Sequence, residues 1–346
     1  MNFKELPNGM CEGFALLKKC EEKKTKSGSS YLDMVIGDKD EEMGAKLWNY
    51  SGGAELEADS VIKVRGRVEQ YNGKNQFVVS QIRPAGNNDE YSLSDLVPSS
   101  AIGGEQLYDM IKARVDKFTN ENLKNLVSAI LEENKEKLIY YPAALKLHHA
   151  MVGGLMYHTM SMVRMAEEIC KIYTNINIEL LLSGIILHDT AKTWELETNK
   201  TGLAKGYSVE GELIGHLVKG AMYINDKAKE LEIDCEEVAL LEHMILSHHG
   251  VPEYGSPIRP MFLEAVILSS LDALDATIYE INDATSKVEP GSFTDRQWAL
   301  DNRKLYNHGL SDTKHSVDFL SEEEKRKIEE EEEKKKAEEE NNNGND

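Results

Sequence analysis

Several features of secreted and membrane proteins are missing from these 346 residues. No apolar run reaches the length of a membrane span, and the N-terminus has no basic segment followed by an apolar one. The scattered cysteines include no CxxC pair, which argues against a disulfide framework and predicts free or buried thiols. They are Cys11, Cys20, Cys170 and Cys235. We therefore expect a cytoplasmic protein without membrane association.

An excess of positive charge is also missing, since 40 Lys and Arg residues stand against 61 Asp and Glu residues. The formal net charge is −21, and residues 321–346, with 12 acidic and 6 basic side chains, account for −6 of it. The remaining −15 argues against a surface coated with positive charge for nonspecific DNA binding. A local basic groove, or a site in which metal ions supply the positive charge, stays compatible with this balance.

The first 88 residues are predicted to form a small β-barrel. Short runs with strand character alternate with turn residues, and a charged turn is expected at 21–30. The runs are residues 14–17, 31–36, 46–50, 61–68 and 76–82. Residues 84–104 are polar and rich in Asn, Ser, Gly and Asp, and residues 89–104 are interpreted as a linker.

An all-α domain is expected over residues 105–315. Apolar residues recur there at spacings of three and four, as in Leu155, Met162, Met165 and Ile169, and His158 falls on the same helical face. Residues 316–346 consist mostly of charged blocks with too few apolar side chains to pack, which predicts a disordered or solvated helical tail.

Histidine is concentrated in the helical part: eight of the ten histidines lie between His148 and His249. One of them opens the doublet His188-Asp189, directly after the apolar run 180–187. Unpaired ionisable groups are costly in a helical core, so a divalent metal site is the simplest explanation. The alternative is a set of core histidines that are each satisfied by hydrogen bonds.

The ordered series of histidines and aspartates resembles the metal signature of the HD phosphohydrolase superfamily. The resemblance implies one ion held by His158, His188, Asp189 and Asp272. It implies a second ion held by Asp189, His216, His248 and His249. Imidazole and carboxylate ligands suit Mn, the ion we expect, and also Fe, Co, Ni or Zn. Two such ions activate water and stabilise displacement at phosphorus.

Five further side chains have two interpretations each. Lys192, four residues after His188, is expected to bind a phosphate oxygen, the alternative being a solvated lysine at a helix end. His149, preceded by His148, either contacts substrate or has a structural role at a helix start. Arg259 either binds phosphate or is a surface arginine. His243 is expected to be a packing or surface residue, and Asp275 an alternate ligand or a residue that orients one.

The whole chain resembles the bacterial YhaM-type 3′-5′ exoribonucleases over about residues 8–310. The matching stretches are 148–159, 187–189, 211–216, 248–257 and 270–276. The resemblance implies an OB-fold barrel that holds single-stranded nucleic acid. It also implies hydrolysis of RNA, with DNA as an alternative, from the 3′ end to 5′-mononucleotides. Tyr157 departs from the acidic residue that many HD proteins have before the first metal histidine.

The barrel carries residues suited to a single strand. Trp48 and Tyr71 are expected to stack on bases and Arg65 to follow phosphates, the alternative being a barrel core and a solvated face. For Phe77 we expect the core. Two other functions remain open, a phosphodiesterase for a cyclic dinucleotide or small nucleotide, and a nonenzymatic nucleic-acid-binding protein. We also expect a homo-oligomer.

Overall fold

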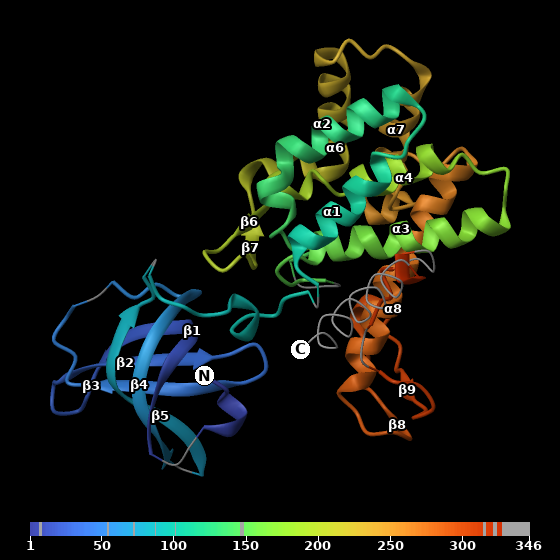
Figure 1. The fold of residues 1–346 in the computed structure, drawn as a ribbon. Helices are drawn as coiled ribbons and strands as arrows, with labels where there is room; N and C mark the ends of the chain where they lie inside the picture. The colour runs from blue at the N-terminus through green and yellow to red at the C-terminus, as the bar shows by residue number, and fades with distance from the viewer. Residues whose placement is uncertain are drawn as a thin grey trace, which may run out of the picture.

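The computed structural model describes residues 1–6, 9–53, 55–71, 73–86, 88–100, 102–145, 149–313, 316–320 and 324–326. An N-terminal β-barrel and a larger helical part lie side by side (Figure 1). Among the described helices, none has both the length and the apolar character needed to cross a membrane.

The barrel is built from five strands that close in the order β1-β2-β3-β5-β4. They are β1 (Met10–Lys24), β2 (Ser30–Gly37), β3 (Glu42–Trp48), β4 (Ser60–Tyr71) and β5 (Lys74–Pro84), preceded by the short helix η1 (Phe3–Glu5). Only β3 and β5 pair in parallel, and the other neighbouring strands are antiparallel. This five-stranded Greek-key barrel is the OB-fold, which confirms the expected fold of the N-terminal part.

The first strand is longer than the sequence predicted. A turn was expected at 21–30, but β1 continues to Lys24 and pairs with β2 up to Ser30. Opposite charges stabilise this extension across the hairpin, since Lys23 is bonded to Asp33 at 2.5 Å on the exposed face. The turn itself occupies only residues 25–29.

Side chains that alternate along the strands fill the barrel. Phe77 is fully buried, as predicted, together with Ala15, Leu17, Met34, Ile36, Ile62 and Val64. Gly66 sits at an irregularity of the β4–β5 pairing, where a Cβ would approach the Val78 carbonyl oxygen to 2.3 Å. Only glycine fits this close contact.

The connection to the helical part is packed. It contains the short helix η2 (Leu93–Asp95), and Leu96 and Val97 are buried. Val97 forms a small apolar cluster with Leu16 of the barrel and Val152 of the helical part. The segment expected to be a polar linker therefore joins the two parts through buried side chains.

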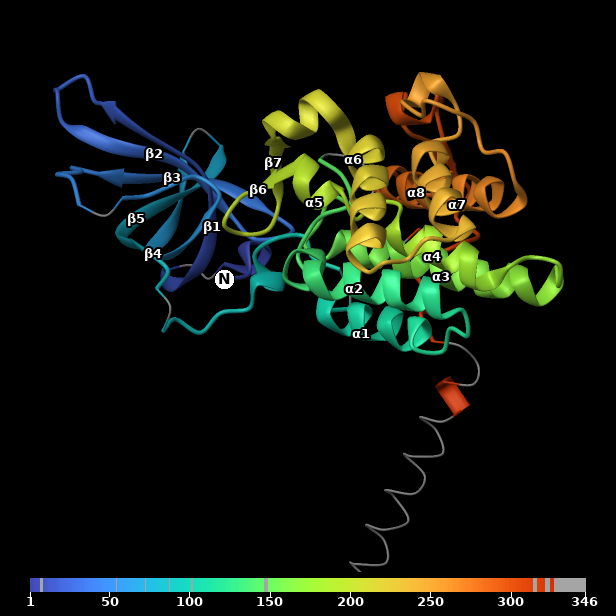
Figure 2. The ribbon, with the colours of Figure 1, turned by 90° about the horizontal axis from the view of Figure 1, so that it is seen from above.

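Helices dominate the rest of the chain (Figure 2). They are α1 (Gly104–Val115), α2 (Glu121–Leu138), α3 (Gly154–Ile172), α4 (Ile178–Leu187), α5 (Lys192–Glu195), α6 (Val209–Glu230), α7 (Glu236–Ser247) and α8 (Leu263–Ser286). Smaller elements are β6 (Leu196–Thr198), β7 (Ala204–Tyr207), η3 (Pro252–Tyr254), β8 (Ser292–Phe293), η4 (Trp298–Leu300) and β9 (Tyr306–Asn307).

Helix α4 is the centre of this part. All residues from Leu180 to Leu187 are buried, because α4 contacts α2, α3, α7 and α8. A helix surrounded in this way needs no polar face, which explains the unbroken apolar run. His188 and Asp189 directly follow its last residue and are buried in the interior.

The chain returns to the helices after β9. Phe319 is buried, and its ring meets that of Tyr157 edge to face at 4.8 Å. Glu324 pairs with Arg114 of α1 at 3.2 Å. The expected tail, 316–346, therefore begins with packed residues. Phe319 is a single apolar residue among charged ones, so the charge pattern gave no sign that it packs. Residues 327–346 lie outside the described part of the chain.

Candidate metal centre

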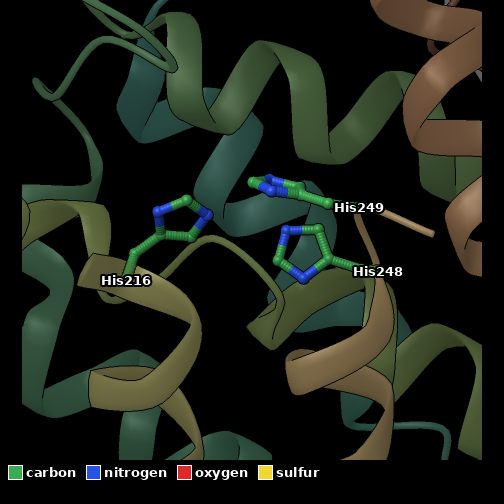
Figure 3. Close-up of side chains that lie close together, drawn as sticks. All are labelled: His216, His248 and His249. Atoms are coloured by element: carbon green, nitrogen blue, oxygen red, sulfur yellow. The ribbon is translucent and has the colours of Figure 1, made fainter. Parts of the chain in front are cut away.

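The helical part brings the predicted histidines and aspartates together in its interior. His158 comes from α3, His188 and Asp189 from the end of α4, and Asp272 from α8. His216 comes from α6, and the pair 248–249 follows α7. In Figure 3 the rings of His216, His248 and His249 face one another.

Asp189 is the central carboxylate of this group. Its Oδ2 lies 3.2 Å from His188 Nε2 and 4.0 Å from His158 Nε2. Its Oδ1 lies 3.5 Å from His216 Nε2 and 3.7 Å from His248 Nε2. The two oxygens thus face two different sets of imidazoles, which is the arrangement required of a carboxylate shared between two cations.

Buried atoms without a partner provide the test of whether metal fits here. The Nε2 atoms of His188, His216 and His248 and Oδ1 of Asp189 are buried without a hydrogen-bond partner among the described residues. In His188 and His248 the other ring nitrogen, Nδ1, lies 2.7 Å from a backbone carbonyl and donates to it. This tautomer directs the Nε2 lone pairs toward the centre, so these residues fit a divalent ion.

The ligand atoms gather in overlapping triplets. One atom each from His158, His188 and Asp189 lies within 4.8 Å of the others, and the same holds for His188, His248 and Asp272. A further triplet with the same spacing consists of His216, His248 and His249. Because His188 and His248 each belong to two of these triplets, the ligand atoms form one continuous cluster around Asp189.

The electrostatics keep the Asp189 carboxylate ionised and the His249 imidazole neutral. Burial raises the pKa of Asp189, but His188 and Lys192 outweigh this and hold its pKa well below the usual range. Burial and the neighbouring His248 lower the pKa of His249 to about 4, so its ring stays neutral. A neutral imidazole and an ionised carboxylate are the forms that bind metal.

His158 lies between two carboxylates. Its Nε2 is 3.2 Å from Asp272 Oδ1, and its Nδ1 is 2.7 Å from Asp275 Oδ2. Burial disfavours the charged ring, but these carboxylates raise the pKa of His158 to about 10. The position beside Nε2 therefore stabilises a positive charge, whether a proton or a metal ion supplies it.

Two carboxylates, Asp275 and Glu195, bind the Nδ1 atoms of His158 and His216, on the side of each ring away from Nε2. Asp275 accepts hydrogen bonds from His158, from His149 at 2.9 Å and from Ser161. Oε1 of Glu195 accepts from the backbone N–H of His216 at 3.0 Å and from its Nδ1 at 2.9 Å. The spacing from Asp272 had pointed to Asp275, but no pattern in the sequence pointed to Glu195.

Lys192 is buried beside the centre. Its ammonium is 2.6 Å from Asp189 Oδ2, and it lines a cavity of about 760 Å³ together with His216, His249 and Asp272. The chain leaves the helix at His188, so Lys192 starts the separate short helix α5 rather than continuing α4. The alternative of a solvated lysine does not fit this buried position.

The remaining predicted residues do not face the centre of the site: some are buried in the surrounding core and others are exposed at the surface. His149 is fully buried against Tyr157 and Tyr279, so a structural role fits it and direct substrate contact does not. Arg259 is exposed on the loop before α8. His243 accepts a hydrogen bond from the backbone N–H of Met261, in keeping with packing. His148 lies outside the described residues.

On the barrel, Trp48 and Tyr71 are 44% and 65% exposed, and Arg65 projects outward from β4. The Trp48 and Tyr31 rings lie 4.8 Å apart between centroids and are tilted by 33°, and Lys46 Nζ lies 4.9 Å from the Tyr31 ring centroid. Tyr31 was not singled out in the sequence, although it stands opposite Trp48 across the β2–β3 pair.

The family comparison agrees with this architecture. The HD domain family matches residues 155–277, and a family described as putative helicase matches residues 100–179. Fold and site together define an HD-domain protein with an attached OB-fold barrel. Among solved structures, the second OB-fold domain of replication protein A from Methanococcus maripaludis is 19% identical, with 27% of this chain and 100% of that chain covered and a TM-score of 0.21.

Curated relatives identify the family more narrowly. The 3′-5′ exoribonuclease YhaM of Bacillus licheniformis is 36% identical over 85% of this chain and 93% of its own length. The protein of the same name from Oceanobacillus iheyensis is 35% identical over 88% of this chain and 95% of its own length. The chain belongs to the YhaM family.

Proposed function

We propose that this protein is a metal-dependent 3′-5′ exoribonuclease that releases 5′-mononucleotides from single-stranded RNA. The observation that carries the proposal is the convergence of imidazoles from α3, α4, α6 and α7 on the two oxygens of Asp189. Family membership supports RNA as the substrate, because the curated relatives are named as exoribonucleases.

In this proposal two divalent ions occupy the centre, with Mn as the first candidate. His158, His188, Asp189 and Asp272 hold one ion, and Asp189, His216, His248 and His249 hold the other. Ions bound here supply Lewis acidity at the phosphate and an activated water. The choice of Mn rests on the mixed imidazole and carboxylate ligands.

The surrounding residues have separate tasks. Glu195 and Asp275 fix the ring orientation of His216 and His158. Lys192 lines the cavity, and its ammonium approaches a phosphate oxygen of the substrate. There it stabilises the negative charge that develops on the phosphate during displacement. The barrel, assigned to residues 1–88, holds the strand by stacking on Trp48 and Tyr71 and by pairing of Arg65 with phosphate.

End-labelled RNA tests this function. Mn-loaded protein should shorten a 5′-labelled single strand stepwise from its 3′ end and release 5′-mononucleotides, and Asp189→Asn should abolish shortening. Asparagine keeps the side-chain shape, so an unchanged circular dichroism spectrum controls for folding. Cleavage of a cyclic dinucleotide without RNA shortening would favour the small-nucleotide phosphodiesterase instead. RNA binding without any hydrolysis would favour a binding protein.

A further inference from the structure

We propose that the cavity beside the metal centre contains a nucleobase subsite whose stacking surface is Trp298. The inference rests on the proposed function, since it places the base of the terminal nucleotide whose phosphate lies at the metal ligands. It concerns the helical part alone and is independent of the barrel.

The cavity extends from the metal ligands to a group of aromatic side chains. His216, His249 and Asp272 line one part of it, and Tyr207, Tyr254 and Trp298 also line it. These aromatics come from β7, η3 and η4, three separate segments, and are 46%, 70% and 75% exposed. Large exposed aromatic surface gathered at one cavity is typical of a binding site.

Helix α8 connects the two parts of the cavity. Asp272, Ala276 and Glu280 lie on one face of α8 and all line the cavity. At 1.5 Å per residue, the face runs roughly 12 Å from the metal ligand to Glu280. Ala273 and Ala276 line it between these carboxylates, so small side chains leave room there for a sugar.

Trp298 is exposed but stands on an anchored segment. Leu300, two residues later, is buried, and η4 contacts α8. Gln297 and Arg303 form a bridge on either side of η4, with a backbone hydrogen bond of 2.8 Å from Gln297 N–H to the Arg303 carbonyl. A backbone held in this way gives up little conformational freedom when a base stacks on the indole that it carries, which favours binding.

The two parts of the cavity differ in charge, and this difference favours phosphate in one part and the base in the other. Lys192 lies beside the metal ligands, whereas Glu280 and Asp301 line the cavity as additional carboxylates. Carboxylates repel a phosphate but accept hydrogen bonds from ribose hydroxyls and base amino groups. The aromatic part of the cavity therefore fits an uncharged base better than a second phosphate of the RNA strand.

Binding of a mononucleotide and of its baseless analogue tests the subsite without turnover. Calorimetry with Mn-loaded protein should show 5′-AMP binding more tightly than ribose 5-phosphate. Stacking on one aromatic is worth about 1–3 kcal/mol, which corresponds to about 5- to 150-fold in Kd. Trp298→Ala should remove most of this difference and leave ribose 5-phosphate binding unchanged, and Trp298→Tyr should retain most of it.

Tyr173→Ala is the matched control, because Tyr173 is 60% exposed at the end of α3 and is not part of the cavity lining. It should leave both ligands unaffected. Equal binding of AMP and ribose 5-phosphate by the wild type would refute the subsite while leaving the phosphate site intact. A difference that persists in Trp298→Ala would place the base elsewhere. Failure of both ligands to bind would overturn the proposed metal-phosphate site as well.

Discussion

Glu195→Ala is the sharpest perturbation of the metal centre, because Glu195 is not itself among the proposed ligands. Its Oε1 accepts two hydrogen bonds from His216, through the backbone N–H and through Nδ1. Removing the carboxylate frees the imidazole to rotate and no longer selects the tautomer with Nε2 available. Loss of such an orienting partner typically lowers metal affinity about 10- to 100-fold, which corresponds to about 1.4–2.8 kcal/mol.

The stability of the protein should fall in the same variant. The His216 N–H is buried and loses its acceptor, which costs about 1–3 kcal/mol of the free energy of unfolding. Glu195→Gln keeps an acceptor oxygen but no charge, so we expect an intermediate loss of metal affinity. The two losses are measured by thermal denaturation and by competition for Co²⁺ against a chelator of known affinity.

Glu197→Ala is the control, since Glu197 is exposed two residues further on and pairs only with Lys205 among the described residues, at 3.1 Å. An exposed pair of this kind contributes little, so metal affinity and stability should both stay near wild type. Wild-type metal affinity in Glu195→Ala would show that packing alone orients His216, and the reasoning would be refuted.

Three further predictions concern other parts of the molecule. Lys192→Met should keep its metal content and lower kcat on RNA about 10²- to 10³-fold, and an unchanged kcat would remove the phosphate role. Trp48→Ala should weaken binding of long RNA about 5- to 150-fold in a filter-binding assay and leave AMP binding unchanged. Burial raises the pKa of Asp38, but N–H donors from Phe3 and two turn residues outweigh this and lower it. That stabilisation is present above the ordinary aspartate pKa and fades as the pH falls through the lowered value. Asp38→Asn should therefore lower the unfolding midpoint at pH 7 and approach wild type in acid.

The inward-facing positions of His158, His188 and Asp189 could be predicted because each residue is tied to a local apolar pattern. His158 lies on the apolar face of α3, and the doublet of Asp189 ends the apolar run of α4. A polar residue in such a position must face the core, whatever the arrangement of the helices. The strands of the barrel could be predicted for the same reason, because burial alternates along them.

Glu195 could not be found in this way, because its role depends on the backbone around it. Gly215 has a φ of 73° and kinks α6, which directs the N–H of His216 toward Glu195. A Cβ on Gly211 would lie 2.3 Å from the Glu195 carbonyl oxygen, so the two segments pack backbone to backbone. Neither contact has a periodic signature in the sequence. The role of the two glycines becomes visible only in the folded chain, where the two segments pack together.

The same contrast separates the chemistry of this protein from its specificity. The proposed metal ligands lie on helices, or directly after them, and the apolar pattern of these helices fixes which side faces inward. Trp298, Tyr207 and Tyr254 sit on short elements that are 3 or 4 residues long. Elements this short carry no periodicity, so only the folded chain brings their side chains to one cavity. The residues of the proposed base subsite are therefore harder to predict from sequence than the proposed metal ligands.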